Sequence, residues 1–168
     1  MTDQIRSKKL WIFGVVIVAV SLLLLIVWLW LFRPFLPSAV RRQVSFVVLY
    51  PNNRSTAKVD RNTIKYDSDK KILTYAAREG EAQLIVTNQS SPDTFTDIPQ
   101  TYDKVLEGMH PYSSFDSLHG KVSLTHPATV SNQVAVTNTV GTLMFVRTNR
   151  DLSDDQWRQF FNNLAEFK

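Results

Sequence analysis

The chain of 168 residues contains no cysteine and only five glycines. Without cysteine, the protein cannot form a disulfide, an iron–sulfur cluster or a zinc–thiolate site, and it has no cysteine nucleophile. The few glycines form no loop of the kind that cradles phosphate groups. Extracellular eukaryotic domains of this size often carry disulfides. The absence of cysteine therefore favours a bacterial protein whose domain is stable from its core alone.

One long segment lacks charge. Residues 10–32 are 23 residues without Asp, Glu, Lys or Arg. A helix of that length spans about 34 Å, enough for a hydrocarbon core of about 30 Å. Trp11 lies near one end, and Trp28 and Trp30 lie near the other, where indole rings favour the headgroup boundary. The sequence therefore predicts one transmembrane helix over residues 10–32, preceded by a basic tail at residues 1–9.

Basic residues flank this predicted helix on both sides, so the positive-inside rule alone gives little preference for either orientation. The short, densely basic tail favours the cytoplasm, and long domains translocate with little regard for charge. We expect a single-pass protein of the cell membrane, with a cytoplasmic N-terminus and the C-terminal domain outside. The predicted membrane interface comprises Lys8, Lys9, Trp11, Trp28, Trp30, Arg33, Arg41 and Arg42.

A cleaved signal peptide is the alternative interpretation of the apolar run. Its apolar region normally has about 7–15 residues and precedes a small-x-small cleavage site. The run here is longer, and the best candidate site, at residues 37–39, begins with proline. An uncleaved anchor is favoured.

The rest of the chain is unevenly charged. Residues 33–78 hold ten Lys or Arg and three Asp, a balance of +7. Residues 79–168 hold six Lys or Arg and eleven Asp or Glu, a balance of −5. Chance clustering on a solvated surface is one explanation. Attraction to anionic lipid headgroups, at about 1 kcal/mol for each nearby basic residue, is the other. Nucleic-acid binding is not expected, because no recognition motif accompanies the basic residues.

The pattern after the anchor predicts one α+β domain. Residues 33–43 are interpreted as a juxtamembrane linker, and residues 44–168 suit one domain with one core. Pro99 suits the first turn of a helix over 97–108, and Ser153 and Gln156 suit a capping box that starts a helix reaching Phe167. Alternating apolar and β-branched residues predict strands at 44–50, 63–66, 71–77, 82–88, 121–125, 133–139 and 142–148. We therefore expect a small antiparallel sheet with two helices on one face.

Candidate catalytic and metal-binding residues are few. His110, His119 and His126 are separated by nine and seven residues, which matches no compact metal motif, even with Asp116 among them. Solvated loop histidines are the favoured interpretation. No Gly-x-Ser-x-Gly elbow marks a serine nucleophile. The Asp154–Asp155 pair is better explained by a helix first turn than by a glycosidase site. No catalytic, cofactor-binding or metal-binding residue is predicted.

Two short segments carry a resemblance. The Val-Thr-Asn-Gln segment at residues 86–89 and the Leu-Ser-Asp-Asp-Gln-Trp segment at 152–157 occur in a chain with a basic tail, one helix and an outer domain. This layout resembles small bacterial single-pass membrane proteins of unknown function with PsbP-like α+β extracytoplasmic domains. The resemblance implies a fold and a location but no catalytic residue.

These features favour a non-enzymatic binding or accessory module that is tethered in the cell envelope. Its expected partners are the lipid bilayer and another envelope protein, and no cofactor is expected. Two alternatives stay open. One is an envelope hydrolase with an unrecognised site. The other is a subunit of a membrane assembly in which Gly14 and Ser21, seven residues apart on one helix face, form a weak small-residue seam.

Overall fold

The computed structural model describes residues 18–25, 36–127 and 132–168. The chain divides into two units, Met1–Phe35 and Leu36–Lys168. In the first unit, residues 18–25 are helical and their large apolar side chains are exposed. Among the residues that the structure describes, every helix is too short or too polar to cross a bilayer. Most of the predicted transmembrane helix lies outside the described residues, as do Lys8, Lys9, Trp11, Trp28, Trp30 and Arg33.

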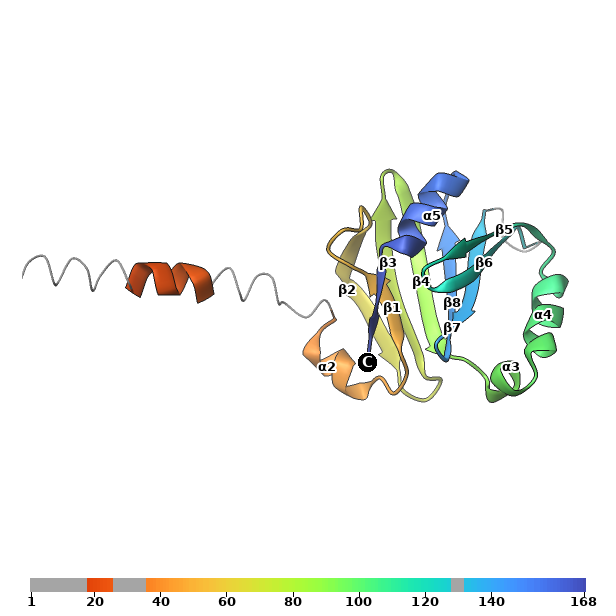
Figure 1. Cartoon of the computed structure of the whole chain (residues 1–168), viewed down its shortest axis with the longest axis horizontal. Helices are drawn as coiled ribbons and strands as arrows, with labels where there is room; N and C mark the ends of the chain where they lie inside the picture. The colour runs from red at the N-terminus through yellow and green to blue at the C-terminus, as the bar shows by residue number, and fades with distance from the viewer. Residues whose placement is uncertain (1–17, 26–35, 128–131) are drawn as a thin grey trace, which may run out of the picture. The chain divides into compact units, whose positions relative to one another are not determined.

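The second unit is built on a seven-stranded antiparallel sheet in the order β2-β3-β4-β8-β7-β6-β5 (Figure 1). Two runs of consecutive hairpins meet where β4 pairs with β8. The predicted antiparallel α+β fold is confirmed. The strands are β2 Lys58–Asp67, β3 Ile72–Glu79, β4 Ala82–Ser90, β5 Pro111–Ser117, β6 Gly120–Thr125, β7 Val134–Thr139 and β8 Thr142–Thr148.

A tight turn sets the register of the central hairpin. Val140 and Gly141 join β7 to β8 and have φ of 45° and 74°. Two successive residues with positive φ make the two-residue turn whose twist matches that of the flanking strands. Thr139 and Thr142 are therefore direct partners across the turn.

One face of the sheet, here called the α5 face, is buried along its whole width. A row of register partners crosses five strands through Tyr75, Val86, Val146, Ala135 and Leu124. None of these side chains is more than 1% exposed. Such continuous burial requires a covering layer.

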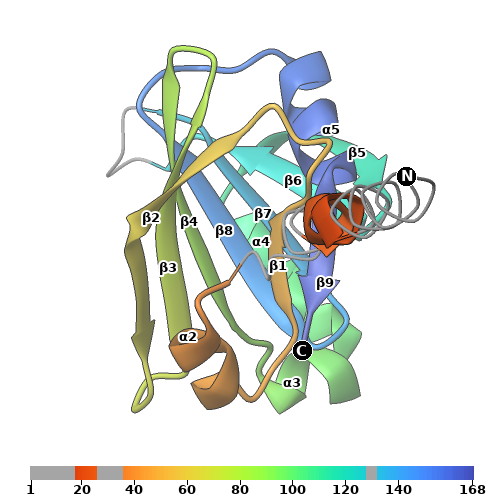
Figure 2. The same cartoon turned by 90° about the vertical axis from the view of Figure 1, so that its left-hand side faces the viewer.

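The covering layer consists of a helix and a two-stranded ribbon. β1 Val48–Pro51 pairs antiparallel with β9 Leu164–Phe167, beside helix α5 Asp154–Asn162 (Figure 1 and Figure 2). The capping box at the start of α5 is confirmed, because Ser153 accepts from the Gln156 backbone and the Gln156 side chain accepts from the Ser153 backbone. Trp157, Phe160 and Phe161 of α5 are fully buried.

The sheet holds β1 through side-chain hydrogen bonds. The backbone N–H of Leu49 donates to Asn88 Oδ1 at 3.1 Å, and the Tyr75 hydroxyl donates to the Leu49 carbonyl at 3.1 Å. Thr142 Oγ1 donates to the carbonyl of Val47. Burial of unpaired backbone groups would cost about 1–3 kcal/mol each, so these side chains make the burial of β1 possible.

The opposite face, here called the α4 face, is partly covered by α3 Asp93–Asp97 and α4 Pro99–Gly108. Phe95, Tyr102, Leu106 and Met109 pack against Val134, Val136 and Leu143. Val136 is one of the residues that alternate with the buried row on the α5 face. The expectation of two helices on one face is therefore wrong, since α4 and α5 lie on opposite faces.

Local predictions differ from the structure at several places. The last helix ends at Asn162, and the predicted helical residues 164–167 form β9 instead, because they pair with β1. β5 occupies a segment for which the sequence predicted no strand. Helix α4 begins at Pro99, two residues after the predicted start at 97, and its N-cap residue Ile98 makes no side-chain cap.

Part of the predicted linker is folded. Residues Ser38–Gln43 form helix α2, which packs against β2. Leu36 is only 2% exposed. The folded unit thus begins several residues before the first predicted strand.

The burial of α5 predicts a large stability effect. Phe160→Ala should lower the free energy of unfolding by about 3–5 kcal/mol, because it removes a fully buried ring from the α5 face. The neighbouring Gln159→Ala, at an exposed position on the same helix, should change it by less than about 0.5 kcal/mol. Urea unfolding followed by Trp157 fluorescence measures both. Equal effects would contradict the packing described.

Candidate functional site

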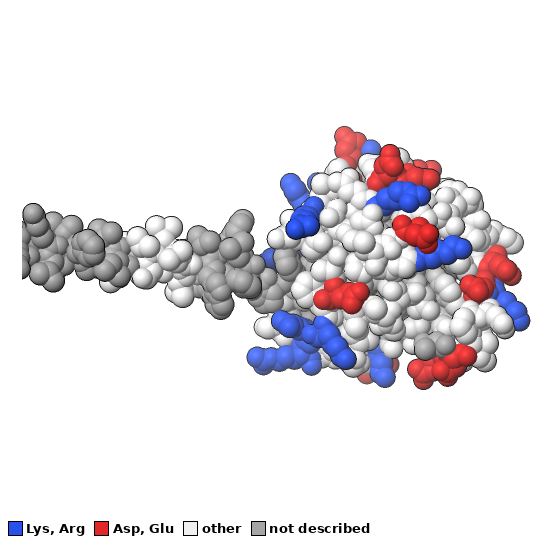
Figure 3. Space-filling model, in the orientation of Figure 1, with Lys and Arg blue, Asp and Glu red and all other residues white. Residues whose placement is uncertain are grey.

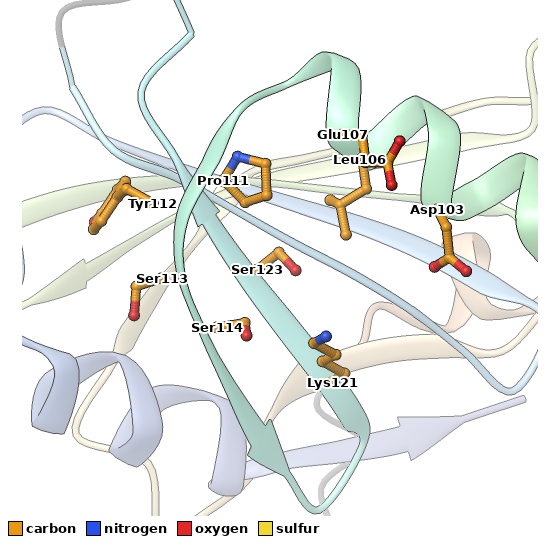
Figure 4. Close-up of a pocket in the computed structure, with 9 residues that line it drawn as sticks. All are labelled: Asp103, Leu106, Glu107, Pro111, Tyr112, Ser113, Ser114, Lys121 and Ser123. Atoms are coloured by element: carbon orange, nitrogen blue, oxygen red, sulfur yellow. The ribbon is translucent and has the colours of Figure 1, made fainter.

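A groove of about 620 Å³ lies between α4 and the hairpin of β5 and β6 (Figure 4). It is called the α4–β5 groove here. A volume of about 300–1,000 Å³ is typical of ligand sites. Its lining residues are Asp103, Leu106, Glu107, Pro111, Tyr112, Ser113, Ser114, Lys121 and Ser123.

Helix α4 supplies the acidic wall. Tyr102, Leu106 and Met109 turn one side of α4 toward the sheet. Residues three and four apart are neighbours on a helix surface, so Asp103 and Glu107 share the flank beside that packed side. Like charges at this spacing destabilise a helix by a few tenths of a kcal/mol. The two carboxylates are therefore not explained by helix stability.

The strands supply a floor of hydroxyl groups and one ammonium group. Ser114 and Ser123 are direct partners on β5 and β6, and Lys121 lies two residues before Ser123 on the same face. Ser123 is only 2% exposed, although it lines the groove. A β-bulge between Pro111 and Ser113 adds Tyr112 to β5, and Ser113, which also lines the groove, is the register partner of Leu124 on the α5 face.

These polar side chains have no partners within the described part of the chain. The carboxylates of Asp103 and Glu107, the Lys121 ammonium group and the hydroxyls of Ser114 and Ser123 make no hydrogen bond or ion pair there. All of these residues except Ser123 are exposed, so a ligand can reach them. A concave surface with several unpaired polar groups of both charges is suited to a ligand that supplies the missing partners.

Tyr112 connects the groove to the core. Its hydroxyl accepts a hydrogen bond from Gln133 Nε2 at 2.7 Å, and its ring stacks on His126 at 4.9 Å. The Gln133 Oε1 atom accepts from Trp157 Nε1 at 2.9 Å. Burial raises the pKa of Tyr112, and the hydrogen bond from Gln133 lowers it. The buried side-chain amide of Gln133 thus holds both Tyr112 at the rim of the groove and Trp157 of α5.

Arg41 and Arg42, the two described residues of the predicted membrane interface, lie in the last turn of α2, and both are exposed. The other six interface residues lie outside the described residues. The structure therefore places only these two arginines of the predicted interface, both on the folded unit.

His119 is not the solvated loop residue that the sequence suggested. Its side chain is only 10% exposed, with Nε2 at 3.1 Å from the Leu164 carbonyl and Nδ1 at 3.3 Å from Glu166 Oε1. Both partners belong to β9, so this histidine fastens the C-terminal strand. His126 stacks on Tyr112, and His110 is exposed with φ of 51°. Within the described ranges, no three metal-ligating side chains come together.

Sequence reasoning missed the whole α4–β5 groove, because it treated residues 111–117 as a loop. One signal was present. The segment Pro111–Ser117 and the segment after Gly120 both carry β-compatible residues, and Gly120 has the positive φ of a hairpin turn. The serines that line the groove could have been found by pairing these two segments.

Comparisons of the chain with protein-family models, with curated proteins and with solved structures found no match.

The position of Asp103 beside Tyr102 predicts a measurable change in the pKa of that tyrosine. Burial, and secondly the charge of Asp103, raise the pKa of Tyr102 to about 12. Asp103→Asn should lower this pKa, but burial should keep it above the ordinary value of 10.0. NMR of a tyrosine labelled with ¹³C at Cζ measures it, with Glu107→Gln as the control that leaves it unchanged. An unaltered pKa in the Asp103 variant would contradict the geometry.

The same titration affects stability in a definite direction. The pKa of Tyr102 is higher in the folded state than in the unfolded state. Its contribution to the free energy of unfolding is therefore complete below pH 10.0 and is lost as the pH rises through about 12.

Proposed function

We propose that the protein is a membrane-anchored binding module of the cell envelope. Residues 10–32 cross the bilayer once, and the folded unit lies outside the cell. The observation that carries the anchor is the uncharged run of 23 residues. Within it, residues 18–25 are helical, and Leu22, Leu23, Leu24 and Leu25 are each more than half exposed. A contiguous exposed apolar surface of this kind suits an apolar environment.

Charged substitutions in this run test the anchor. Arginine at Leu23, Leu24 and Leu25 should each oppose insertion by about 2.5–3.5 kcal/mol near the helix centre. We expect the triple variant to move from the membrane pellet to the supernatant after carbonate extraction. The matched triple alanine variant should stay in the pellet.

A reporter fused after Lys168 tests the orientation. Activity of a reporter that works only outside the cytoplasm is the expected result. A triple arginine variant that stays in the pellet, or a fusion that is active only in the cytoplasm, would contradict the proposed arrangement.

The α4–β5 groove supports the binding role. Asp103 and Glu107 provide two carboxylates for one cationic group, and charge-assisted hydrogen bonds are about twice as strong as neutral ones. Across the groove, Lys121 and the serine hydroxyls can donate to carbonyl oxygens. A polypeptide segment with a lysine or arginine side chain carries both kinds of group. We therefore propose an extended basic segment of another envelope protein as the ligand.

A short peptide tests this ligand class. The peptide acetyl-Gly-Lys-Gly-amide should shift the NMR amide signals of Ser113, Ser114 and Ser123 in the full chain held in phosphatidylcholine nanodiscs. The same peptide with acetyl-lysine should not, because it lacks the positive charge that Asp103 and Glu107 would bind.

Matched variants identify the residues responsible. Asp103→Asn together with Glu107→Gln should lower the affinity for the lysine peptide at least severalfold. Asp93→Asn with Asp97→Asn removes two exposed carboxylates from the neighbouring α3 and should leave binding unchanged. Equal shifts with both peptides, or equal loss in both variants, would reject a cationic ligand at this groove.

A further inference from the structure

A second hollow, of about 460 Å³, lies over β2, β3 and β4. Its lining comes from three neighbouring rows of register partners, and the middle row contains Ala77 and Leu84. These two are at most 4% exposed, so their side chains point to the α5 face. The hollow therefore opens on the α4 face, with the backbone of the middle row as its floor and the side chains of the two outer rows as its walls.

One outer row breaks a local rule of sheet stability. Lys58 on β2 and Arg78 on β3 are direct partners in the register, and both are exposed. Like charges directly opposite each other destabilise a sheet. Neither side chain makes an ion pair within the described part of the chain. A charged pair that breaks a folding rule without a compensating contact is most often found at a functional site.

The other outer row adds an apolar side chain and a third cation nearby. Ile85 is 45% exposed, and its register partner on β8 is the exposed Arg147. Asp60 also lines the hollow, and its Oδ1 atom accepts from the backbone N–H of Asn62 at 3.0 Å. The lining of the hollow thus combines two basic side chains, the Asp60 carboxylate bonded to the backbone of Asn62, and the exposed Ile85, and a third basic residue, Arg147, lies beside Ile85.

One further basic residue continues this surface. Lys65 lies farther along β2 on the α4 face. Figure 3 views the α5 face, where other Lys and Arg gather on the side of α2 and β2 and most Asp and Glu lie elsewhere. We give the name basic edge to the basic residues of the α4 face, Lys58, Lys65, Arg78 and Arg147.

The length of the chain indicates what covers the basic edge. Leu36, the first residue of the folded unit, follows the end of the uncharged run at residue 32 by four residues. Four extended residues span at most about 14 Å. A folded unit tethered this closely stays near the bilayer surface, where its exposed basic residues are attracted to anionic headgroups.

We propose that the basic edge docks on the anionic phosphate headgroups of the bilayer that holds the chain's own N-terminal segment. A phosphate group lies between Lys58 and Arg78, and Ile85 contacts the apolar part of the headgroup region. This proposal rests on the proposed anchor.

A single spin label can test the docking, since the chain has no cysteine of its own. Ile85→Cys carries a nitroxide in the full chain, reconstituted in nanodiscs of phosphatidylcholine alone or of phosphatidylcholine with phosphatidylglycerol. We expect accessibility to water-soluble nickel chelate to fall severalfold only in the anionic nanodiscs. The same label at Leu118→Cys, a 78% exposed position after β5, should stay accessible in both.

Charge variants identify the surface. Arg78→Glu should restore accessibility at position 85 in anionic nanodiscs, and it should leave the melting temperature equal or higher, because it replaces a like-charge pair with Lys58. Lys104→Glu makes the same charge change at an exposed position on α4 and should have no effect on the label. High salt should weaken the docking, because it screens exposed charges.

Three results would overturn the proposal. They are equal accessibility in both kinds of nanodisc, equal effects of Arg78→Glu and Lys104→Glu, and full protection of the label by inorganic phosphate in phosphatidylcholine nanodiscs. The last result would assign the hollow to a soluble phosphate compound. Co-elution of the chain with nanodiscs reports on the anchor separately, so loss of docking with retained co-elution distinguishes this proposal from the anchor itself.

Discussion

The burial of Leu49 is the constraint on which the rest of the folded unit depends. β1 lies on the α5 face, away from either edge of the large sheet, so the sheet's backbone cannot satisfy its outward N–H and carbonyl groups. Asn88 and Tyr75 satisfy them from the sheet instead. With β1 held in this way, β9 can pair with it and α5 is drawn over Phe115 and the central strands. Removal of either side chain would leave a buried backbone group without its partner.

This covering layer gives the two faces of the sheet different roles. The α5 face is a continuous core. The α4 face is covered only where α3 and α4 pack on β7 and β8. Its uncovered parts lie toward the two edge strands, where the α4–β5 groove and the hollow over β2–β4 are found. The first has an acidic wall and the second is basic, so the two ends of one face are suited to ligands of opposite charge.

Local signals in the sequence predicted much of the fold but little of the candidate site. The strand at 142–148 carries a continuous apolar run and was predicted with the bounds that the structure has, and the capping box at Ser153 and Gln156 depends on residues only three apart. In contrast, Leu164 and Phe167 continue the helical spacing of α5, and only their pairing with β1 makes them a strand. The groove escaped prediction because Asp103 and Ser123 come from elements whose packing depends on distant residues such as Val136.

The sequence by itself determined the properties that depend on composition and short spacing. These are the absence of thiol chemistry, the uncharged run at 10–32, the uneven charge and the α+β class, because each follows from residues that are close together in the chain. Only the tertiary structure decided which faces α4 and α5 cover, that His119 fastens β9, and that Lys58 lies directly opposite Arg78. Those features depend on strand register and on burial, and both are set by contacts between residues far apart in the sequence.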